Sequence, residues 1–439
     1  MAEFREELRS ELQTWLDALN TVAFLMELSR SRHQRVRLHG RLKVRVTLYN
    51  GDKITLLSPC VRVTKKRQPG RPPKRGKSKL IHVGLIALGF IQYKSPGLMS
   101  KVARSAVSST SFDTARQALA LDGIRISADS VRKWTLLYAD KFIGNRQQAV
   151  LDGAEKQMGL RLHICVDGGR IRLREKWKGK NGVRKKGSFE GNWREPKVIV
   201  IYCLNSKGEL LRQLRPVYDG TMGNWLQAFE LLQQWLTHYN LADAERITFC
   251  ADGGLAIWDK VKPMFERLGV RSYKEVVDYT HAKQNMQEVI DKINAYSLFH
   301  KSEITEKVRD LLWKGDIKGI RELARERLGT RKRAWKQVNK KLDGYFGCSE
   351  RFQYQQLKKQ GHDIGSGVVE SAIRRVINLR LKSAGSFWHK DNCERILYLR
   401  GQLLSGRWKM LDHHLEKNRH MLLRYKDFNR SEETLCLAV

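Results

Sequence analysis

The order of apolar segments and amphipathic helices over residues 162–277 limits the fold more than any other feature. Short apolar or alternating stretches predict strands, and apolar residues at helical spacing predict helices. In chain order the sequence predicts strands over 162–166, 198–204 and 209–214, a helix over 225–239, a strand over 247–251, a helix over 255–268 and a strand over 273–277. This order indicates an α/β domain built on a mixed sheet.

Composition and periodicity divide the rest of the chain. Helical spacing predicts a helix from residue 1 to about 38, and alternation around Asn50-Gly51 predicts a β-hairpin. We expect a helical part with the hairpin (1–64), a basic linker (65–79), a helix-turn-helix (80–150), the first part of the α/β core (158–280), charged helices (281–362), the last helices of the core (363–405) and a basic tail (406–439).

The charge balance narrows the class of partner. The chain carries 83 Lys and Arg against 46 Asp and Glu, a formal net charge of +37. An excess of this size repels itself in a compact protein and is typical of proteins that bind a polyanion. No apolar run reaches the roughly 18 residues that a membrane span requires. We therefore expect a cytoplasmic, nucleoid-associated protein that binds DNA and no membrane.

The spacing of the cysteines along the sequence matches no metal-binding or redox motif. The seven are scattered, and no two form a Cys-x-x-Cys pair. Such a set reads as reduced thiols that act mostly as small core residues.

Two copies of Asp-Gly-Gly follow apolar strands in the predicted core. Asp167 comes two residues after Cys165, and Asp252 comes two residues after Cys250. A strand end holds a carboxylate on a rigid element, and glycine lets a metal ion or phosphate approach the backbone. The alternative is that Asp-Gly is a common turn pair that closes a strand. The matching flanks favour a shared site.

A third carboxylate is needed if two divalent cations are to be held, because such ions require several oxygen ligands. Glu370 is the best choice, in or just after the first turn of a helix predicted from about Ser366 to Leu381. An acid at this position is also favoured by the helix dipole in any protein. Arg374 lies one turn further on the same face, which fits a carboxylate beside a DNA backbone.

These features together resemble the DDE transposases of bacterial insertion sequences. The stretches VDGGRIRLRE, WREPKV, CADGG and GSGVVES through SFW carry the resemblance, which covers roughly residues 158–405. It implies an RNase H-like mixed sheet with an all-α insertion at 281–362, preceded by helical and helix-turn-helix DNA-binding modules. It also implies that Asp167, Asp252 and Glu370 are both the catalytic residues and the metal ligands.

A shorter signature supports the same family. The long spacer between Asp252 and Glu370 is similar to that of hAT and Mutator-like relatives, which carry Cys/Asp-x-x-His after the second Asp. Asp278 and His281 match this signature, so we expect them near the site together with Arg374. The alternative is that His281 merely caps a helix.

The resemblance implies two Mg²⁺ ions, with Mn²⁺ as a substitute, and two reactions. One is hydrolysis of the phosphodiester at transposon ends, and the other is strand transfer by the freed 3′-OH into target DNA. The partner is double-stranded DNA, both end repeats and target, and a homo-oligomer is expected in the synaptic complex. The alternatives are a DNA-binding regulator or inactive relic, and an RNase H-like nuclease without strand transfer.

Several basic segments are expected to contact DNA. One resembles an AT-hook, one is a recognition helix over 128–138, one is a basic hairpin over 170–197, and one is the helix that carries Glu370. A plain linker, an ordinary helix pair and a solvated loop are the alternatives for the first three. Trp388 could stack on a displaced base, but core packing is favoured for it. The expected contacts are Arg67, Arg71, Ser130, Arg132, Lys133, Arg170, Arg172, Lys185, Lys186, Arg375, Arg380 and Lys382.

Overall fold

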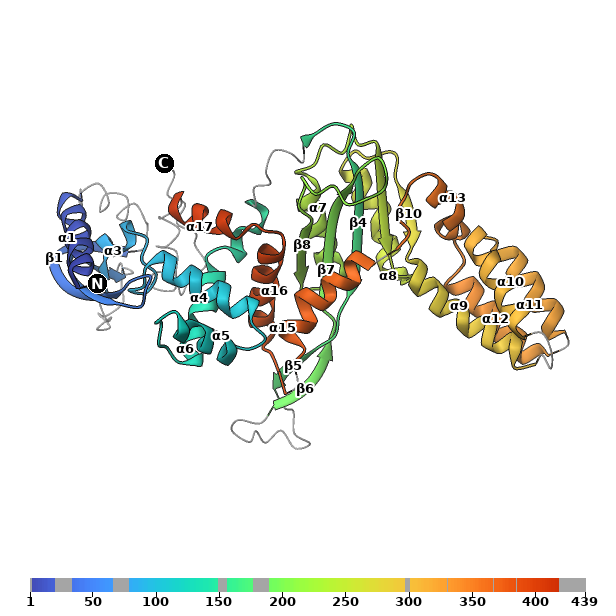
Figure 1. Ribbon diagram of the computed structural model, residues 1–439, viewed down its shortest axis with the longest axis horizontal. Coiled ribbons are helices and arrows are strands. Elements are labelled where there is room, and N and C mark those ends of the chain that lie inside the picture. The colour runs from blue at the N-terminus through green and yellow to red at the C-terminus, as the bar shows by residue number, and fades with distance from the viewer. Residues whose placement is uncertain are drawn as a thin grey trace, which may run out of the picture. The chain divides into compact units, whose positions relative to one another are not determined.

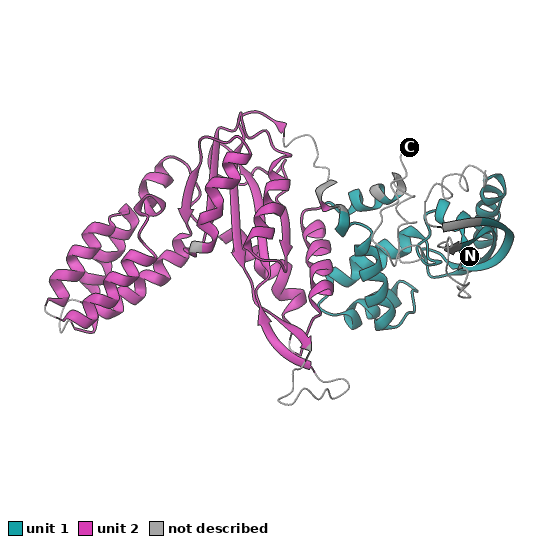
Figure 2. Cartoon of the chain, turned by 180° about the vertical axis from the view of Figure 1, so that it is seen from behind, with its two compact units in different colours: residues 1–144, 407–439 teal, residues 145–406 magenta. Residues whose placement is uncertain are grey.

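The chain forms two compact units in a computed structural model (Figure 2). Unit 1 comprises residues 1–144 and 407–439, and unit 2 comprises residues 145–406. The structure describes residues 2–19, 34–65, 79–148, 156–176, 189–296, 301–329, 331–365, 367–383 and 385–417. Most of the predicted basic linker, with Arg67 and Arg71, lies outside the described residues, as do Lys185 and Lys186.

Unit 1 begins with a helix on a small antiparallel sheet. Its first elements are α1 (Ala2–Ala18), β1 (Gln34–Thr47), β2 (Lys53–Lys65), β3 (Lys79–His82) and α3 (Val83–Ala87). The predicted hairpin around Asn50-Gly51 is confirmed, and Leu16 of α1 packs with Val46 and Leu56. The predicted helix over 1–38 is wrong for residues 34–38. They extend β1 instead, because β2 offers a strand partner there, with Leu38 opposite Val61.

The second half of unit 1 is helical: α4 (Pro96–Ser108), α5 (Phe112–Leu121) and α6 (Ala128–Asp140). The predicted helix pair at 109–139 is confirmed, with a turn at Gly123 and Ser127 as the N-cap of α6. The 406–439 segment is not simply a polar tail. It contains α17 (Trp408–Lys417), whose Trp408 donates a hydrogen bond to Ser100 of α4 (2.9 Å). Residues 418–439 lie outside the described part of the chain.

Unit 2 is an α/β domain with a five-stranded mixed sheet (Figure 1). The strand order is β10 (Lys274–Val277), β9 (Arg246–Ala251), β4 (Arg161–Gly168), β7 (Lys197–Leu204), β8 (Val217–Thr221). β4, β7 and β8 pair antiparallel, whereas β9 and β10 run parallel to β4. The predicted mixed α/β sheet is therefore confirmed.

The predicted third strand, over 209–214, is wrong. Those residues form turns with one isolated bridge, and the strand is β8. The apolar pattern did not predict β8, because the strand has a polar residue, Asp219, in its middle. This residue is nevertheless fully buried. Trp235 donates a hydrogen bond to Asp219 (2.9 Å) and Arg146 pairs with it, so the burial of this acid is compensated.

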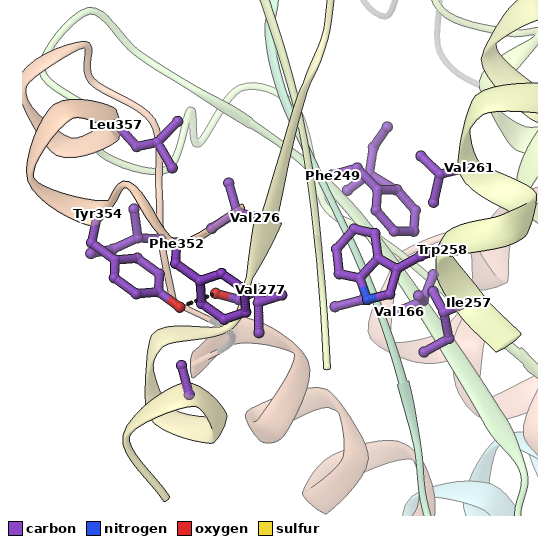
Figure 3. Close-up of a cluster of buried hydrophobic side chains, with 14 of the residues drawn as sticks. Val166, Phe249, Ile257, Trp258, Val261, Val276, Val277, Phe352, Tyr354 and Leu357 are labelled. Carbon is purple, nitrogen blue, oxygen red and sulfur yellow. Dashed lines mark hydrogen bonds between the residues drawn. The ribbon is translucent and has the colours of Figure 1, made fainter. Parts of the chain in front are cut away.

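Alternation along β4 gives the sheet two different faces. Leu162, Ile164 and Val166 join the hydrophobic core with α7 (Trp225–Leu236) and α8 (Leu255–Arg267). Figure 3 shows Phe249 of β9 against Trp258 and Val261 of α8. Residues with the opposite parity in β4 point to the other face, where α14 (Gly367–Ala372) packs against β4 and β7.

Helices lie between β10 and α14 in the sequence, as expected for 281–362. They are α9 (Tyr279–Asn294), α10 (Lys301–Lys314), α11 (Ile317–Leu328), α12 (Lys332–Gly344) and α13 (Tyr354–Lys359). Their apolar core is continuous with that of the sheet. Figure 3 shows the junction, where Tyr354 donates a hydrogen bond to the carbonyl oxygen of Val277 (3.0 Å) and Phe352 packs beside it.

The last helices of unit 2 continue from α14. A π-helical segment (Ile373–Asn378) and α15 (Leu379–Leu381) follow α14, and α16 (Lys390–Leu404) packs against β8. Among the helices that the structure describes, none has the length and apolar composition needed to cross a membrane.

Phe249 is the residue of the sheet core whose substitution we expect to lower the stability of unit 2 strongly. It is fully buried, and its ring centroid lies 5.8 Å from those of both Phe229 and Trp258. We expect Phe249→Ala to lower the free energy of unfolding by about 3–5 kcal/mol, because a large cavity forms. Urea denaturation measures this, with the exposed Leu226→Ala of α7 as control. Equal losses in both variants would contradict the core assignment.

Candidate functional site

The parallel pairing of β4 and β9 brings two acids to one edge of the sheet. Cys165 pairs with Cys250 and Val166 with Ala251, so Asp167 and Asp252 come next on adjacent strands. Each carboxylate accepts a hydrogen bond from the amide of the following glycine at 2.6 Å. The two Asp-Gly-Gly motifs therefore meet at the carboxyl ends of neighbouring strands, as the sequence predicts.

Asp278 supplies a third acid from the next strand. It directly follows β10, is fully buried, and its amide donates to the carbonyl oxygen of Ala251 (2.9 Å). Its Oδ2 accepts a hydrogen bond from the amide of His281 (2.8 Å) and lies 2.9 Å from the Nδ1 atom of the His281 ring. Asp278 is thus the N-cap of α9, and His281 turns back toward the acids.

Electrostatics couple these four residues. The pKa of Asp167 is raised to about 6, first by burial and then by the charges of Asp252 and Asp278, while the Gly168 amide and His281 oppose the shift. The close approach of Asp278 is the largest cause that raises the pKa of His281 to about 9, against the effect of burial. His281 is therefore a cation near neutral pH and offsets part of the repulsion between the carboxylates.

Tyr345, at the C-terminal end of α12, reaches the same cluster. Its hydroxyl donates a hydrogen bond to Oδ1 of Asp252 (2.9 Å), and burial and the Asp252 charge raise the pKa of this tyrosine. A Cβ atom on Gly253 would lie 2.3 Å from the Tyr345 ring. Sequence reasoning missed Tyr345, and the only signal for it is the glycine after Asp252.

The two glycines after Asp167, like Gly253, lie close to side chains from other segments. A Cβ atom on Gly168 would lie 1.9 Å from the carboxylate of Glu195, and one on Gly169 would lie 2.3 Å from Ile377. Neither motif depends on the left-handed backbone region, since no glycine in either has a positive φ. The glycines serve close approach of side chains rather than a tight turn.

Glu370, the expected third metal ligand, lies on a helix rather than at a strand end. It is exposed in the first turn of α14, the helix that packs against β4 and β7. The charges that act most on Asp167 are those of His281, Asp252 and Asp278. The structure therefore brings Asp167 and Asp252 near Asp278 and His281. Arg374 is also exposed, in the π-helical segment.

The basic residues that follow Glu370 have different surroundings. Arg375 donates a hydrogen bond to the hydroxyl of Tyr218 (2.8 Å). Arg380 is only 2 % exposed, lies over the Trp388 ring, and burial lowers its pKa to about 10. The sequence reading of Arg380 as a surface contact is therefore wrong for this conformation, and core packing is confirmed for Trp388. Lys382 is exposed.

The predicted basic hairpin is present as β5 (Ile171–Lys176) and β6 (Phe189–Arg194). Arg172 lies over the rings of Trp193 and Phe387, at 5.0 and 5.5 Å from their centroids. Trp193 is half exposed, and Arg170 at the base of the hairpin is exposed. This surface combines cations with accessible aromatic faces, the pattern used to bind nucleic acids.

The predicted recognition helix is α6. Both Arg132 and Lys133 pair with Asp129 at 2.7 Å, and the Ser130 amide donates to Ser127 at the N-cap. These side chains are exposed or half-buried, so the ion pairs are weak and can be exchanged for phosphate contacts.

The acids at the sheet edge are oxygen donors, the type of ligand that hard divalent cations prefer. Mg²⁺ prefers oxygen ligands, and Asp167, Asp252 and Asp278 present carboxylates from three adjacent strand ends. Burial first, and then the charges of Asp252 and Asp278, raise the pKa of Asp167, and a bound cation would favour its ionised form. Comparisons with protein-family models and with curated proteins give no match to this chain.

Asp167 gives divalent-ion binding a defined pH dependence. Its pKa in the folded chain, about 6, lies above its ordinary value of 3.8. Without a cation, its contribution to stability is therefore complete below about pH 4 and is lost as the pH rises through about 6. Because a cation competes with this proton, we expect Mn²⁺ affinity to rise about tenfold per pH unit below pH 6 and then level off.

Isothermal titration calorimetry between about pH 5 and pH 7.5 measures this dependence, and Asp167→Asn should remove the slope. A flat profile in the unmodified protein would contradict the coupling of Asp167 to the cation.

Tyr345→Phe tests whether the hydroxyl positions Asp252. The ring remains against Gly253, but the hydrogen bond to the carboxylate is lost. We expect Mn²⁺ affinity to fall by about tenfold, as for other residues that orient a metal ligand. Tyr296→Phe, at a tyrosine that is 48 % exposed, is the matched control and should leave the affinity unchanged. Equal affinities in all three proteins would show that Tyr345 is only a packing residue.

Proposed function

We propose that this chain is a DNA transposase with an RNase H-like catalytic core in unit 2. The observation that supports this most directly is that Asp167, Asp252 and Asp278 lie at the carboxyl ends of the adjacent strands β4, β9 and β10, where the charges of the other two acids act on Asp167. Ligands of open α/β sheets gather at this edge. Asp167, a carboxyl with a raised pKa beside other acids at such an edge, is a candidate for a catalytic role.

The strand order supports the RNase H-like proposal. In the transposases that this chain resembles, the first Asp lies on the first strand of the sheet and the second Asp ends the fourth. Here β4 is the first strand of the five in chain order and β9 is the fourth. The helices α9–α13 fall between the fifth strand and the helix that carries Glu370, where the related subgroups hold their insertion.

The third acid is the point on which the proposal departs from the sequence reading. The charges of Asp252 and Asp278 act on Asp167, and Glu370 lies in the first turn of α14, which packs against β4 and β7. We propose Asp167 and Asp252 as the principal metal ligands, Asp278 as the acid that holds His281 toward them, and Glu370 as the residue that completes the site when DNA and ions are bound. Mutating Asp278 and Glu370 separately distinguishes these roles.

Asp167 and Asp252 would hold the two Mg²⁺ ions of this reaction class, which would supply Lewis-acid activation of the attacking oxygen and stabilisation of the leaving oxygen. The protein supplies fixed positions for its carboxylates. Rigid strands and the glycine amides hold Asp167 and Asp252, and Tyr345 restricts the second of them. The His281 cation lowers the repulsion among the neighbouring carboxylates and would also attract a negatively charged phosphate.

DNA would be held by the basic surfaces of both units. The net charge of +37 provides the sequence-independent part of the attraction. In unit 2 the β5–β6 hairpin directly follows Asp167, so Arg170, Arg172 and Trp193 are carried by the element next to the acid cluster. Homo-oligomerisation in a synaptic complex, with end repeats and target DNA as partners, belongs to the same proposal.

Strand transfer gives the sharpest test. The purified chain is incubated with a labelled DNA end taken from sequence that flanks its reading frame, a plasmid target, and Mg²⁺ or Mn²⁺. Asp167→Asn and Asp252→Asn should lower joining by more than about a hundredfold, the scale on which loss of one electrostatic stabiliser acts. Both variants should still bind the labelled end. Asp259→Asn, at an exposed acid of α8, is the matched control.

Each other outcome has a defined meaning. Cleavage without joined products would favour a nuclease, and binding without cleavage would favour a regulator or an inactive relic. Joining retained by Asp167→Asn or Asp252→Asn would contradict the proposed site. If Glu370→Gln joins normally while Asp278→Asn does not, the third essential acid is Asp278.

A further inference from the structure

A second group of metal-ligating side chains lies inside the same sheet, away from the solvent. His163 and Cys165 are two residues apart on β4, and Cys250 lies opposite Cys165 on β9. All three are fully buried. They point to the face opposite the α7–α8 core, because β4 residues of the other parity fill that core. Neither the proposed reaction nor the apolar core uses them.

The three side chains are close enough to share one ion. One nitrogen of His163 and the sulfur atoms of Cys165 and Cys250 all lie within 4.8 Å of one another. Some point then lies within about 2.8 Å of all three atoms (4.8 Å divided by √3), close to the Zn–S distance of about 2.3 Å and the Zn–N distance of about 2.0–2.1 Å. Small rotations of the side chains would complete such a site.

His163 is the second, independent observation. Its two ring nitrogens are buried, neither makes a hydrogen bond of ordinary geometry among the described residues, and the thiol of Cys165 is the group that interacts with the ring. Its ring lies beside that of Tyr202, with centroids 4.9 Å apart, so packing holds the ring without satisfying either nitrogen. A buried polar atom without a well-formed hydrogen bond is costly, and native proteins rarely retain one without a use such as an ion.

The chemistry of the three ligands selects the kind of ion. Two thiols and an imidazole are soft or borderline donors, which prefer Zn²⁺ over Mg²⁺. The acids at the strand ends are hard oxygen donors with the opposite preference. Asp363, whose carboxylate accepts a hydrogen bond from Tyr202 (2.8 Å), acts electrostatically on all three side chains. Two adjacent sites in one sheet would therefore take different metals.

We propose that His163, Cys165 and Cys250 bind a structural zinc ion that clamps β4 to β9 two residues before the Asp-Gly-Gly motifs. The ion would replace the protons of the two thiols and take the imidazole nitrogen of His163 as a third ligand. Because Asp167 and Asp252 follow on the same two strands, the clamp would fix the spacing of those carboxylates. The inference concerns metal content and does not depend on the proposed reaction.

The test measures metal bound by the full chain, produced with zinc in the medium and purified without chelator. Inductively coupled plasma mass spectrometry should find about one zinc ion per chain. Cys165→Ala, Cys250→Ala and His163→Gln should each lower this content about tenfold or more, because a three-ligand site loses a primary ligand.

Two controls separate this site from other thiols and from the acid cluster. Cys203→Ala removes a buried thiol from β7, a strand of the same sheet, but on the face of the α7–α8 core. It should keep its zinc, as should Asp167→Asn, whose loss affects only the proposed Mg²⁺ site. Loss of zinc from Asp167→Asn alone would mean that the ion sits on the carboxylates, and would overturn the proposal.

If the variants fail to fold, the proposal can still be tested by a measurement on the unmodified protein. X-ray absorption at the zinc edge should show two sulfur ligands at about 2.3 Å and a nitrogen ligand at about 2.0–2.1 Å. After exchange to Co²⁺, the protein should show thiolate-to-cobalt charge-transfer absorption and the visible bands of a tetrahedral ion. A chain purified without zinc, or zinc without sulfur ligands, would refute the site and leave the trio as buried thiols beside a histidine.

Discussion

The register between β4 and β9 is the constraint on which the rest of unit 2 depends. Cys165 opposite Cys250 places Asp167 and Asp252 at one edge and sets which residues face the α7–α8 core. A slip of one residue along β4 would turn Ile164 and Val166 away from that core and bury His163 and Cys165 in their place. Burial of apolar side chains, and not attraction between the acids, therefore holds the carboxylates together.

The acid cluster lowers the stability of the folded chain when no cation is bound. Burial and mutual repulsion raise the pKa of Asp167, so ionising it costs free energy that the core must offset. Three features reduce the cost. Glycine amides bind two carboxylates, Tyr345 donates to Asp252, and His281 provides a positive charge. A site that is costly when empty and relieved by a cation is typical of binding sites rather than of structural ion pairs.

Much of this arrangement could be predicted from the sequence where local patterns decide it. Apolar periodicity located β4, β7, β9 and β10, and the repeated Asp-Gly-Gly motif indicated that Asp167 and Asp252 belong together. The Asp-x-x-His signature pointed to Asp278 and His281 near the site. These predictions hold because each depends on residues that are close in the chain or on strand ends that must share one edge.

The rest depended on tertiary contacts that no local pattern contains. β8 was misplaced because its buried Asp219 interrupts the apolar pattern, and only Trp235 and Arg146 make that burial tolerable. Tyr345 reaches Asp252 from the end of a distant helix. Cysteine spacing along the chain could not reveal the trio of His163, Cys165 and Cys250, because its closeness arises across a strand pair.

Unit 1 consists of two chain segments, one that precedes unit 2 in the sequence and one that follows it. This order affects which fragments can fold and when unit 1 can fold during synthesis. Because α17 covers α4 through Trp408, a fragment that stops at residue 144 would expose the apolar surface that this helix buries. Residues 145–406 form one continuous stretch and can be cloned alone. During synthesis on the ribosome, unit 1 must wait with that surface open until the whole of unit 2 has been translated.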